Sequence, residues 1–341
     1  MIKPAKLQKG DLVATVSPSW GCAGAKRVLW QYRLGCERLK ELGLRVVPAP
    51  HSLRGTAVLR AHPEARADDL MWAFSNKEVK AVVANIGGND CEKLLPFLSP
   101  ETIRKNPKIL CGYSDVLALH LYCFRLGLCT FYGDNLLTNI AENGAWHPYS
   151  RFWFEKTLFD EAPPGRVPPS ADWSYDPSSR VDKTRRKTYA PNPGCLRVQG
   201  SGRVQGRLFG GHGDLRTLRM PDGSPMARRE DFEDAILFFE DIPELCDEKY
   251  MADFFDWLGQ SGFLRLLKGV VIGKMRTPGS FRPYADALRG VVSGKYGLND
   301  LPIVSGLNFG HTSPICVLPY GVKAELDADA LQFTISESGV V

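Results

Sequence analysis

The sequence predicts an α/β protein whose first half forms an open, mostly parallel sheet. Short apolar runs with the length of buried strands alternate with stretches of helical spacing, which is typical of parallel strands joined by right-handed crossovers. The chain has 341 residues, enough for about two domains of roughly 150 residues each. Its 44% apolar and 24% charged residues are ordinary for a globular protein, which excludes extensive disorder and a fibrous repeat.

The first half alternates strands and helices in order along the chain. Strands are expected over 12–16, 45–48, 79–86, 108–112 and 128–132. Apolar residues with helical spacing lie between them, over 26–42, 64–74 and 115–126. Gly43 follows the first of these helices, where a glycine commonly ends a helix. We therefore interpret residues 1–160 as an N-terminal α/β domain.

A proline-rich stretch interrupts this alternation over residues 161–202, and we interpret it as an irregular connecting segment. It contains the most basic run of the chain, from Arg180 to Lys187. One interpretation of that run is a solvated linker or surface loop. The other is a loop that binds an anionic or nucleotide-like group, because long loops in compact enzymes are often functional.

Residues 203–341 resume the α/β pattern and are interpreted as a C-terminal domain. Strands are expected over 235–239, 267–273 and 302–307, and a helix over 249–258. Two further apolar runs, 322–326 and 331–335, flank the short polar stretch 327–329, which indicates a β-hairpin.

Charge and composition restrict the possible partners and the compartment. The net charge of +5 is small for this length, so no nucleic-acid partner is expected. The chain has no apolar run long enough for a membrane helix and starts without the apolar stretch of a signal peptide, so no membrane partner is expected. The nine cysteines are scattered without C-x-x-C spacing, which favours free thiols in a reducing compartment. We expect a cytoplasmic protein.

Two turns after predicted strands have residues suited to chemistry. Ligand sites in open α/β sheets form at the carboxyl ends of the strands. Ser114 lies in such a turn before a helix, where its hydroxyl could be a nucleophile, although Ser114 or Asp115 could instead only cap the helix. The second turn, Gly87-Gly88-Asn89-Asp90, could present free backbone N–H groups as an oxyanion hole or could be an ordinary turn.

Two further strand ends hold an acid and a histidine. Glu240 follows a very apolar strand and could orient a histidine, although Asp241 or Glu244 could take its place. His311 follows another strand and a glycine. In chain order, Ser114, Glu240 and His311 could therefore assemble a serine–histidine–glutamate triad with a nucleophile, an orienting acid and a base.

Six stretches in the same order, over nearly the whole chain, match the motifs of a known family: 17–19, 86–90, 106–115, 237–241, 306–312 and 321–326. On these motifs the chain resembles the serine LD-carboxypeptidases, and within them the MccF-like branch of microcin C resistance proteins. The resemblance implies a Rossmann-like open parallel sheet in the N-terminal domain, a C-terminal α/β domain, and an active site at the domain interface. It also implies a homodimer that uses no metal and no other cofactor.

The resemblance implies a role for each matching residue. Ser114 would be the nucleophile, His311 the general base and Glu240 the acid that orients it. The backbone N–H groups of Gly88 and Asp115 would form the oxyanion hole.

Four further residues are substrate-binding candidates on the same resemblance. Gly87 and Asn89 flank the glycine of the oxyanion hole. Trp173 matches a tryptophan of a loop whose aromatic residues can stack on the adenine of the substrate, and a second tryptophan of that loop is replaced here by Cys195. Asp134 stands where the family often has proline.

Three functions are compatible with these residues. The first is a serine peptidase that cleaves the amide between an aminoacyl or peptidyl group and a nucleotide-like moiety, as in detoxification of microcin C-type toxins. The second is a murein LD-carboxypeptidase that removes the terminal D-alanine from tetrapeptides in cell-wall recycling. The third is a non-catalytic immunity protein that binds a small ligand. Trp173 favours the first, the missing second tryptophan favours the second, and the complete triad argues against the third.

Overall fold

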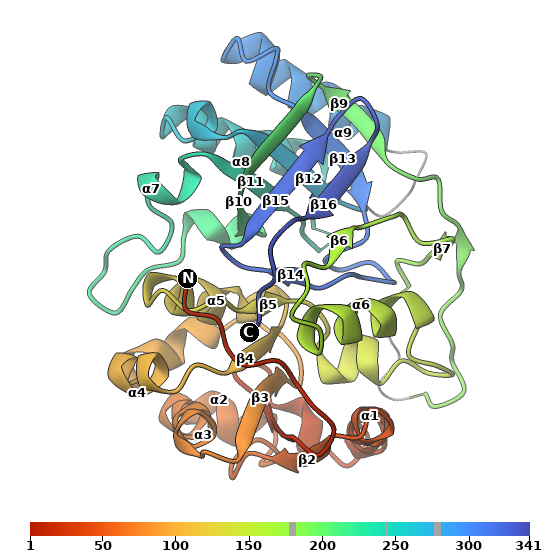
Figure 1. Cartoon of the computed structure of the whole chain (residues 1–341). Helices are drawn as coiled ribbons and strands as arrows, with labels where there is room; N and C mark the ends of the chain where they lie inside the picture. Colours follow the sequence, from red (N-terminus) through yellow and green to blue (C-terminus); the bar gives the residue numbers. More distant parts are fainter. Residues whose placement is uncertain (177–181, 243–244, 276–280) are drawn as a thin grey trace.

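The computed structural model describes residues 1–176, 182–242, 245–275 and 281–341. It has two α/β lobes, each built on its own sheet, with the N-terminal lobe at the bottom of Figure 1 and the second lobe above it. Glu244 and the first part of the basic run, 180–181, lie outside the described residues.

The sheet of the first lobe has the strand order β14-β5-β4-β3-β1-β2. The pairs among β1 to β5 are all parallel, which confirms the alternation predicted for the first half. The edge strand β14 comes from the C-terminal part of the chain and runs antiparallel to β5. The bounds are β1 (Leu12–Val16), β2 (Arg45–Pro48), β3 (Val79–Ala84), β4 (Ile109–Gly112), β5 (Phe131–Tyr132) and β14 (Leu318–Pro319).

Helices surround this sheet, and three of them match the predicted helical stretches. These three, α1, α3 and α5, contact the strands of the sheet, whereas α2, α4 and α6 were not predicted. A proline is the first residue of α3, α4 and α6, a position where its missing N–H breaks no helical hydrogen bond. The bounds are α1 (Leu29–Glu41), α2 (Thr56–Ala61), α3 (Pro63–Ser75), α4 (Pro100–Lys105), α5 (Leu117–Arg125) and α6 (Pro148–Leu158).

The sheet of the second lobe has the order β6-β16-β15-β10-β11-β12-β13-β9. Its centre, β10 to β13, is parallel, and the predicted hairpin is the antiparallel pair β15 and β16. Helices α7 (Arg229–Phe232), α8 (Glu248–Gln260) and α9 (Phe281–Arg289) belong to this lobe. The strands are β6 (Gly165–Arg166), β9 (Leu196–Gln199), β10 (Arg203–Gly211), β11 (Ala235–Phe239), β12 (Gly269–Gly273), β13 (Ile303–Leu307), β15 (Lys323–Asp327) and β16 (Gln332–Ile335).

The segment 161–202 contains short strands as well as irregular chain. β6 and β9 add to the two edges of the second sheet, and β7 (Asp172–Trp173) pairs with β8 (Ala190–Pro191). The described part of the basic run is anchored to the first lobe, because the Asn143 side chain donates to the carbonyls of Asp182 and Arg185. The domain boundaries at 160 and 203 remain predictions.

The two ends of the chain lie near one another (Figure 1). The backbone N–H of Lys6 donates to the carbonyl of Val341 over 2.8 Å, and the N–H of Val341 donates to the carbonyl of Pro4 over 3.0 Å. Ile2 forms a parallel bridge with Leu128. The last residue is therefore tied to the first segment of the chain by backbone hydrogen bonds.

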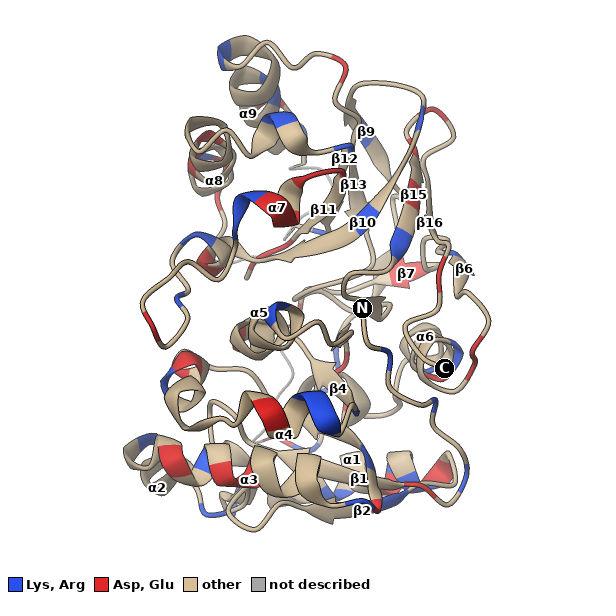
Figure 2. Cartoon of the chain, turned by 60° about the vertical axis from the view of Figure 1, so that its left-hand side comes forward, with Lys and Arg blue, Asp and Glu red and all other residues tan. Residues whose placement is uncertain are grey.

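Charges of both signs are mixed on the helices, as Figure 2 shows along α3, α4 and α7. This mixture agrees with the small net charge of +5. All nine cysteines are free thiols, as their spacing predicts. Among the helices of the described residues, none combines the length and the apolar character that a membrane span needs.

Candidate active site

Ser114 lies at the sharp turn that joins β4 to α5. The strand ends at Gly112, and a 3-10 turn over Ser114–Val116 leads into the helix. The φ angle of Ser114 is 68°, a left-handed conformation that is unusual for a residue with a side chain and is often found at functional sites. A Cβ atom on Gly87 would lie 2.7 Å from Cβ of Ser114, so the neighbouring turn must carry a glycine to approach this closely.

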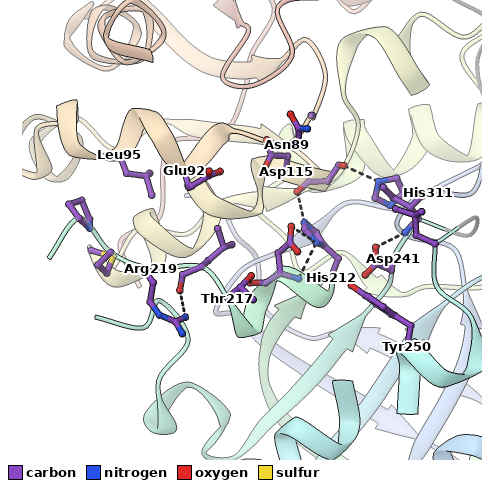
Figure 3. Close-up of a pocket in the computed structure, with 18 of the residues that line it drawn as sticks. Asn89, Glu92, Leu95, Asp115, His212, Thr217, Arg219, Asp241, Tyr250 and His311 are labelled. Carbon is purple, nitrogen blue, oxygen red and sulfur yellow. Dashed lines mark hydrogen bonds and ion pairs between the residues drawn. The ribbon is translucent and has the colours of Figure 1, made fainter. Parts of the chain in front are cut away.

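His311 connects Ser114 to Glu240. Its Nε2 lies 2.9 Å from Oγ of Ser114, and its Nδ1 lies 2.7 Å from Oε2 of Glu240 (Figure 3 shows the contact on the Ser114 side). The same carboxylate oxygen accepts the backbone N–H of His311 over 3.1 Å. In this arrangement a neutral imidazole donates from Nδ1 to Glu240 and can accept the serine proton at Nε2.

Glu240 is buried, with 1% of its surface exposed, directly after β11. Burial raises its pKa, but the facing His311, together with His212 and the Tyr132 hydroxyl, outweighs this effect and holds the pKa of Glu240 below its usual value. The Tyr132 hydroxyl donates to Oε1 of Glu240 and accepts the backbone N–H of Ser114 over 3.3 Å. Tyr132, which was not predicted from the sequence, thus connects Glu240 to the turn of Ser114.

Asp241 has other partners. Its two carboxylate oxygens accept the backbone N–H groups of Gly213 over 3.0 Å and Ile242 over 2.7 Å. Between the two described acids, Glu240 is therefore the one in contact with His311.

The side chain of Asp115 joins the two turns whose N–H groups are the predicted oxyanion hole. Its Oδ2 accepts the backbone N–H groups of Asp90 over 2.8 Å and Cys91 over 2.9 Å, as well as the hydroxyl of Ser19. A Cβ atom on Gly88 would overlap Oγ of Ser19, so the loop lies against Ser19 at this point. The Asp115 carboxylate therefore fixes the position of the glycine loop relative to Ser114.

An ion pair supports the glycine loop from behind. Arg66 is buried and its Nη1 lies 2.8 Å from Oδ1 of Asp90 and 3.0 Å from the carbonyl of Pro18. Arg66 was not predicted as a site residue, because its position within a predicted helix gives no sign of this long-range contact.

His212 is a second residue near Ser114 to which no role was assigned from the sequence. Its Nε2 lies 3.0 Å from the backbone carbonyl of Ser114. A carbonyl oxygen only accepts, so Nε2 carries the hydrogen and Nδ1, which lies 3.7 Å from a carboxylate oxygen of Asp214, faces the other way. His212 follows β10 directly, and this strand-end position was the available signal.

A cavity of about 640 Å³ opens in front of Ser114 and His311 (Figure 3). Its wall includes Gly88 and Asn89 from the predicted glycine loop. Both lobes contribute apolar as well as polar residues to the wall, among them Leu95 and Glu92 from the first and Leu218 and Arg219 from the second. Further lining residues are Asp115, His212, Asp241, Leu245 and Tyr250.

Three of the four predicted substrate-binding residues, Gly87, Asp134 and Trp173, are not in the lining of this cavity. Asp134 is fully buried, and burial raises its pKa well above the usual value, although Lys187 partly opposes this effect. Trp173 is 3% exposed and lines a separate, smaller cavity. Gly87 packs beneath Ser114.

Comparison with known families identifies the chain. Residues 13–133 match the model of the LD-carboxypeptidase N-terminal domain, and residues 205–326 match that of the LD-carboxypeptidase C-terminal domain. The chain belongs to the LD-carboxypeptidase family. This confirms the family predicted from the motifs, and with it an enzyme of the carboxypeptidase type.

Curated relatives of this family member match over most of their length. The putative carboxypeptidase YocD of Bacillus subtilis is 32% identical over 333 residues, covering 95% of each chain. The microcin C7 self-immunity protein MccF of Escherichia coli is 28% identical, covering 89% of this chain and 87% of the relative. A probable murein peptide carboxypeptidase of Bacillus subtilis is 28% identical, covering 99% of this chain and 95% of the relative.

Solved structures confirm the two-lobed α/β fold. An MccF-like protein from Streptococcus pneumoniae in complex with AMP has a TM-score of 0.84 at 29% identity, covering 96% of this chain and 99% of that chain. MccF in complex with aspartyl sulfamoyl adenosine has a TM-score of 0.84 at 28% identity, covering 100% of both chains.

Proposed function

We propose that this chain is a serine peptidase that hydrolyses the amide between an aminoacyl or peptidyl group and a nucleotide-like moiety, as in microcin C-type toxins. The observation that carries the proposal is the continuous hydrogen-bond chain from Glu240 through His311 to Ser114, at the wall of an open cavity. In this proposal Ser114 is the nucleophile, His311 the general base and Glu240 the acid that orients it.

The proposed reaction has two halves. In the first, His311 Nε2 takes the proton of Ser114 Oγ as the oxygen attacks the amide carbonyl. The backbone N–H groups of Gly88 and Asp115 stabilise the oxyanion, His311 then protonates the leaving amine, and an acyl-serine remains. In the second half, His311 takes a proton from water, which attacks the acyl-serine. The bond from the acyl carbon to Oγ then breaks, His311 returns the proton to Oγ of Ser114, and the carboxylic acid is released.

The ligands of two related structures support the proposal that the substrate contains a nucleotide-like moiety. MccF was solved with aspartyl sulfamoyl adenosine, which is an aminoacyl nucleoside analogue. The MccF-like protein was solved with AMP, which is a nucleotide. The cavity volume of about 640 Å³ is within the range of sites for ligands of this size.

A murein LD-carboxypeptidase that removes a terminal D-alanine is the second candidate. The position of Trp173 favours it, because this residue is buried beside another cavity and not in the lining of the one that contains Ser114. A relative of almost the same length is a probable murein peptide carboxypeptidase. A non-catalytic immunity protein would not need the aligned hydrogen bonds of the three residues.

Mass spectrometry of two substrates side by side tests the proposal. One is an aminoacyl sulfamoyl adenosine and the other is a murein tetrapeptide that ends in D-alanine. We expect the amino acid to be released from the nucleoside analogue, and Ser114→Ala to abolish this release while keeping the fold. Release of D-alanine alone would support the murein enzyme, and cleavage of neither substrate would contradict both.

A further inference from the structure

A second cavity lies apart from the catalytic one, and none of the described residues lines both. Its volume is about 220 Å³. Leu196, Met275 and Phe281 contribute apolar walls, and Leu196 is exposed, which indicates that the cavity opens to solvent beside it. A small molecule can therefore reach this cavity without passing Ser114.

A buried ammonium group, that of Lys274, belongs to this cavity. Lys274 is 5% exposed and directly follows β12. Its Nζ donates to the backbone carbonyl of Gly306 and, over 3.1 Å, to Oδ1 of Asn308. Both acceptors are neutral, and among the described residues Lys274 has no ion pair with a carboxylate. A buried charge without a counter-ion is costly, so this arrangement is suited to an anion.

The charge of Lys274 persists near neutral pH. Burial lowers its pKa to about 8, so most of the molecules still carry the ammonium form at pH 7. The ammonium has three hydrogens, and the two acceptors above account for two of them. One donor therefore remains for a ligand.

A second buried donor lines the same cavity. Trp173 is 3% exposed, and its indole Nε1 has no hydrogen-bond partner in the described part of the chain. Buried donors are rarely left unpaired in proteins, so an unpaired indole N–H on a residue that lines a cavity points to a ligand that accepts hydrogen bonds.

We propose that this cavity binds a small monocarboxylate with a short apolar chain, whose carboxylate accepts hydrogen bonds from Lys274 Nζ and Trp173 Nε1. The two donors supply the recognition of the anion, and Met275 and Phe281 supply the contact with its apolar part. A water molecule occupies about 30 Å³, so a cavity of about 220 Å³ has room for about seven non-hydrogen atoms. The site is separate from the proposed hydrolytic reaction and does not depend on it.

Isothermal titration calorimetry of the full chain at pH 7 with two probes of equal size tests this site. The probes are 3-methylbutanoate and its neutral isostere 3-methylbutanamide. We expect saturable binding of the acid. The affinity for the amide should be lower by about tenfold or more, because a charge-assisted hydrogen bond is replaced by a neutral one. Equal affinity for the acid and the amide would overturn the proposal, as would the absence of saturable binding of the acid at millimolar concentrations.

Variants locate the bound acid. Lys274→Met keeps the length of the side chain and removes its charge, and we expect it to weaken binding of the acid by about tenfold or more. Trp173→Phe keeps an aromatic ring and removes the N–H, so it should weaken binding less. Ser114→Ala should bind the acid as the wild type does. Loss of binding in Ser114→Ala would place the acid in the catalytic cavity, and unchanged binding in both Lys274→Met and Trp173→Phe would exclude this site.

Discussion

The hydrogen bond between Glu240 and His311 matters most when the imidazole becomes charged. We expect Glu240→Gln to lower kcat by about 10²- to 10⁴-fold with a small change in KM, because the amide neither fixes the tautomer nor stabilises the imidazolium. Steady-state kinetics on the cleaved substrate measure this effect. Asp241→Asn is the matched comparison, because this acid binds backbone N–H groups, and its loss of kcat should be much smaller. The reverse order would assign the orienting role to Asp241.

The carboxylate of Asp115 holds the backbone of the proposed oxyanion hole in place through hydrogen bonds. Oδ2 accepts two backbone N–H groups at the end of the glycine loop and the hydroxyl of Ser19, and so ties this loop to the turn of Ser114. We therefore expect Asp115→Asn to lower kcat by about 10- to 100-fold while KM changes little, because the misplaced donors stabilise only the transition state. Inhibition constants of a boronic acid that forms an adduct with Ser114 should weaken in parallel.

The exposed carboxylate of Glu101 on α4 provides the control for this prediction, and Glu101→Gln should leave the kinetics unchanged. A rise in KM with an unchanged kcat in Asp115→Asn would show that the carboxylate contributes to substrate binding and not to transition-state stabilisation.

Among the elements, His120 of α5 couples this helix to β4, the strand that precedes Ser114. It is fully buried, with Nε2 at 2.8 Å from the carbonyl of Gly112 and Nδ1 at 2.8 Å from the Thr130 hydroxyl. Burial lowers its pKa to about 4. The unfolded chain takes up this proton near pH 6.5, whereas the folded chain stays neutral down to about pH 4.

The free energy of unfolding should therefore fall as the pH falls from about 6.5 to about 4, and His120 accounts for up to about 3 kcal/mol of this loss. Urea unfolding at a series of pH values measures it. His120→Gln should be less stable at pH 7 and should show a shallower pH dependence than the wild type. The exposed His62 is the comparison site, and His62→Gln should keep the wild-type slope. Equal slopes in all three proteins would contradict the assignment to His120.

Elements with a local signature could be predicted from the sequence. The parallel strands and the turn of Ser114 were found because apolar runs and a strand-to-helix junction are visible within a few residues. Helix α6 was missed although Pro148 at its first position is a start signal, and β6 and β7 were missed because two-residue strands leave no periodic pattern.

Residues whose role depends on distant contacts could not be predicted. Tyr132 meets Glu240 across 108 positions of the sequence, and His212 meets Ser114 across 98. Tyr132 lies in an apolar run like an ordinary core residue, and the position of His212 directly after a strand does not reveal its partner. For Trp173, a motif match predicted a contact with the substrate. The structure places this residue in the wall of the smaller cavity and not in the wall of the cavity that contains Ser114.

In the molecule as a whole, the residues of the proposed triad come from both lobes. Ser114 follows β4 of the first sheet, whereas Glu240 and His311 follow β11 and β13 of the second. The lobes are also joined by β14, which lies between two C-terminal stretches of the second lobe in the sequence but pairs with β5 of the first. The geometry of the proposed triad therefore depends on the contact between the lobes.

The backbone hydrogen bonds of Val341 with Pro4 and Lys6 hold the two ends of the chain side by side. Because these ends are adjacent, a short glycine-rich linker could join them, and new ends could be opened in the exposed turn at Asn299 and Asp300. Such a circular permutant carries His311, Ser114 and Glu240 in that order. We expect it to fold and to keep kcat within about tenfold of the parent, which cleavage kinetics would show, because a triad is defined by its arrangement in space. The activity would then not depend on the order of the three residues in the sequence.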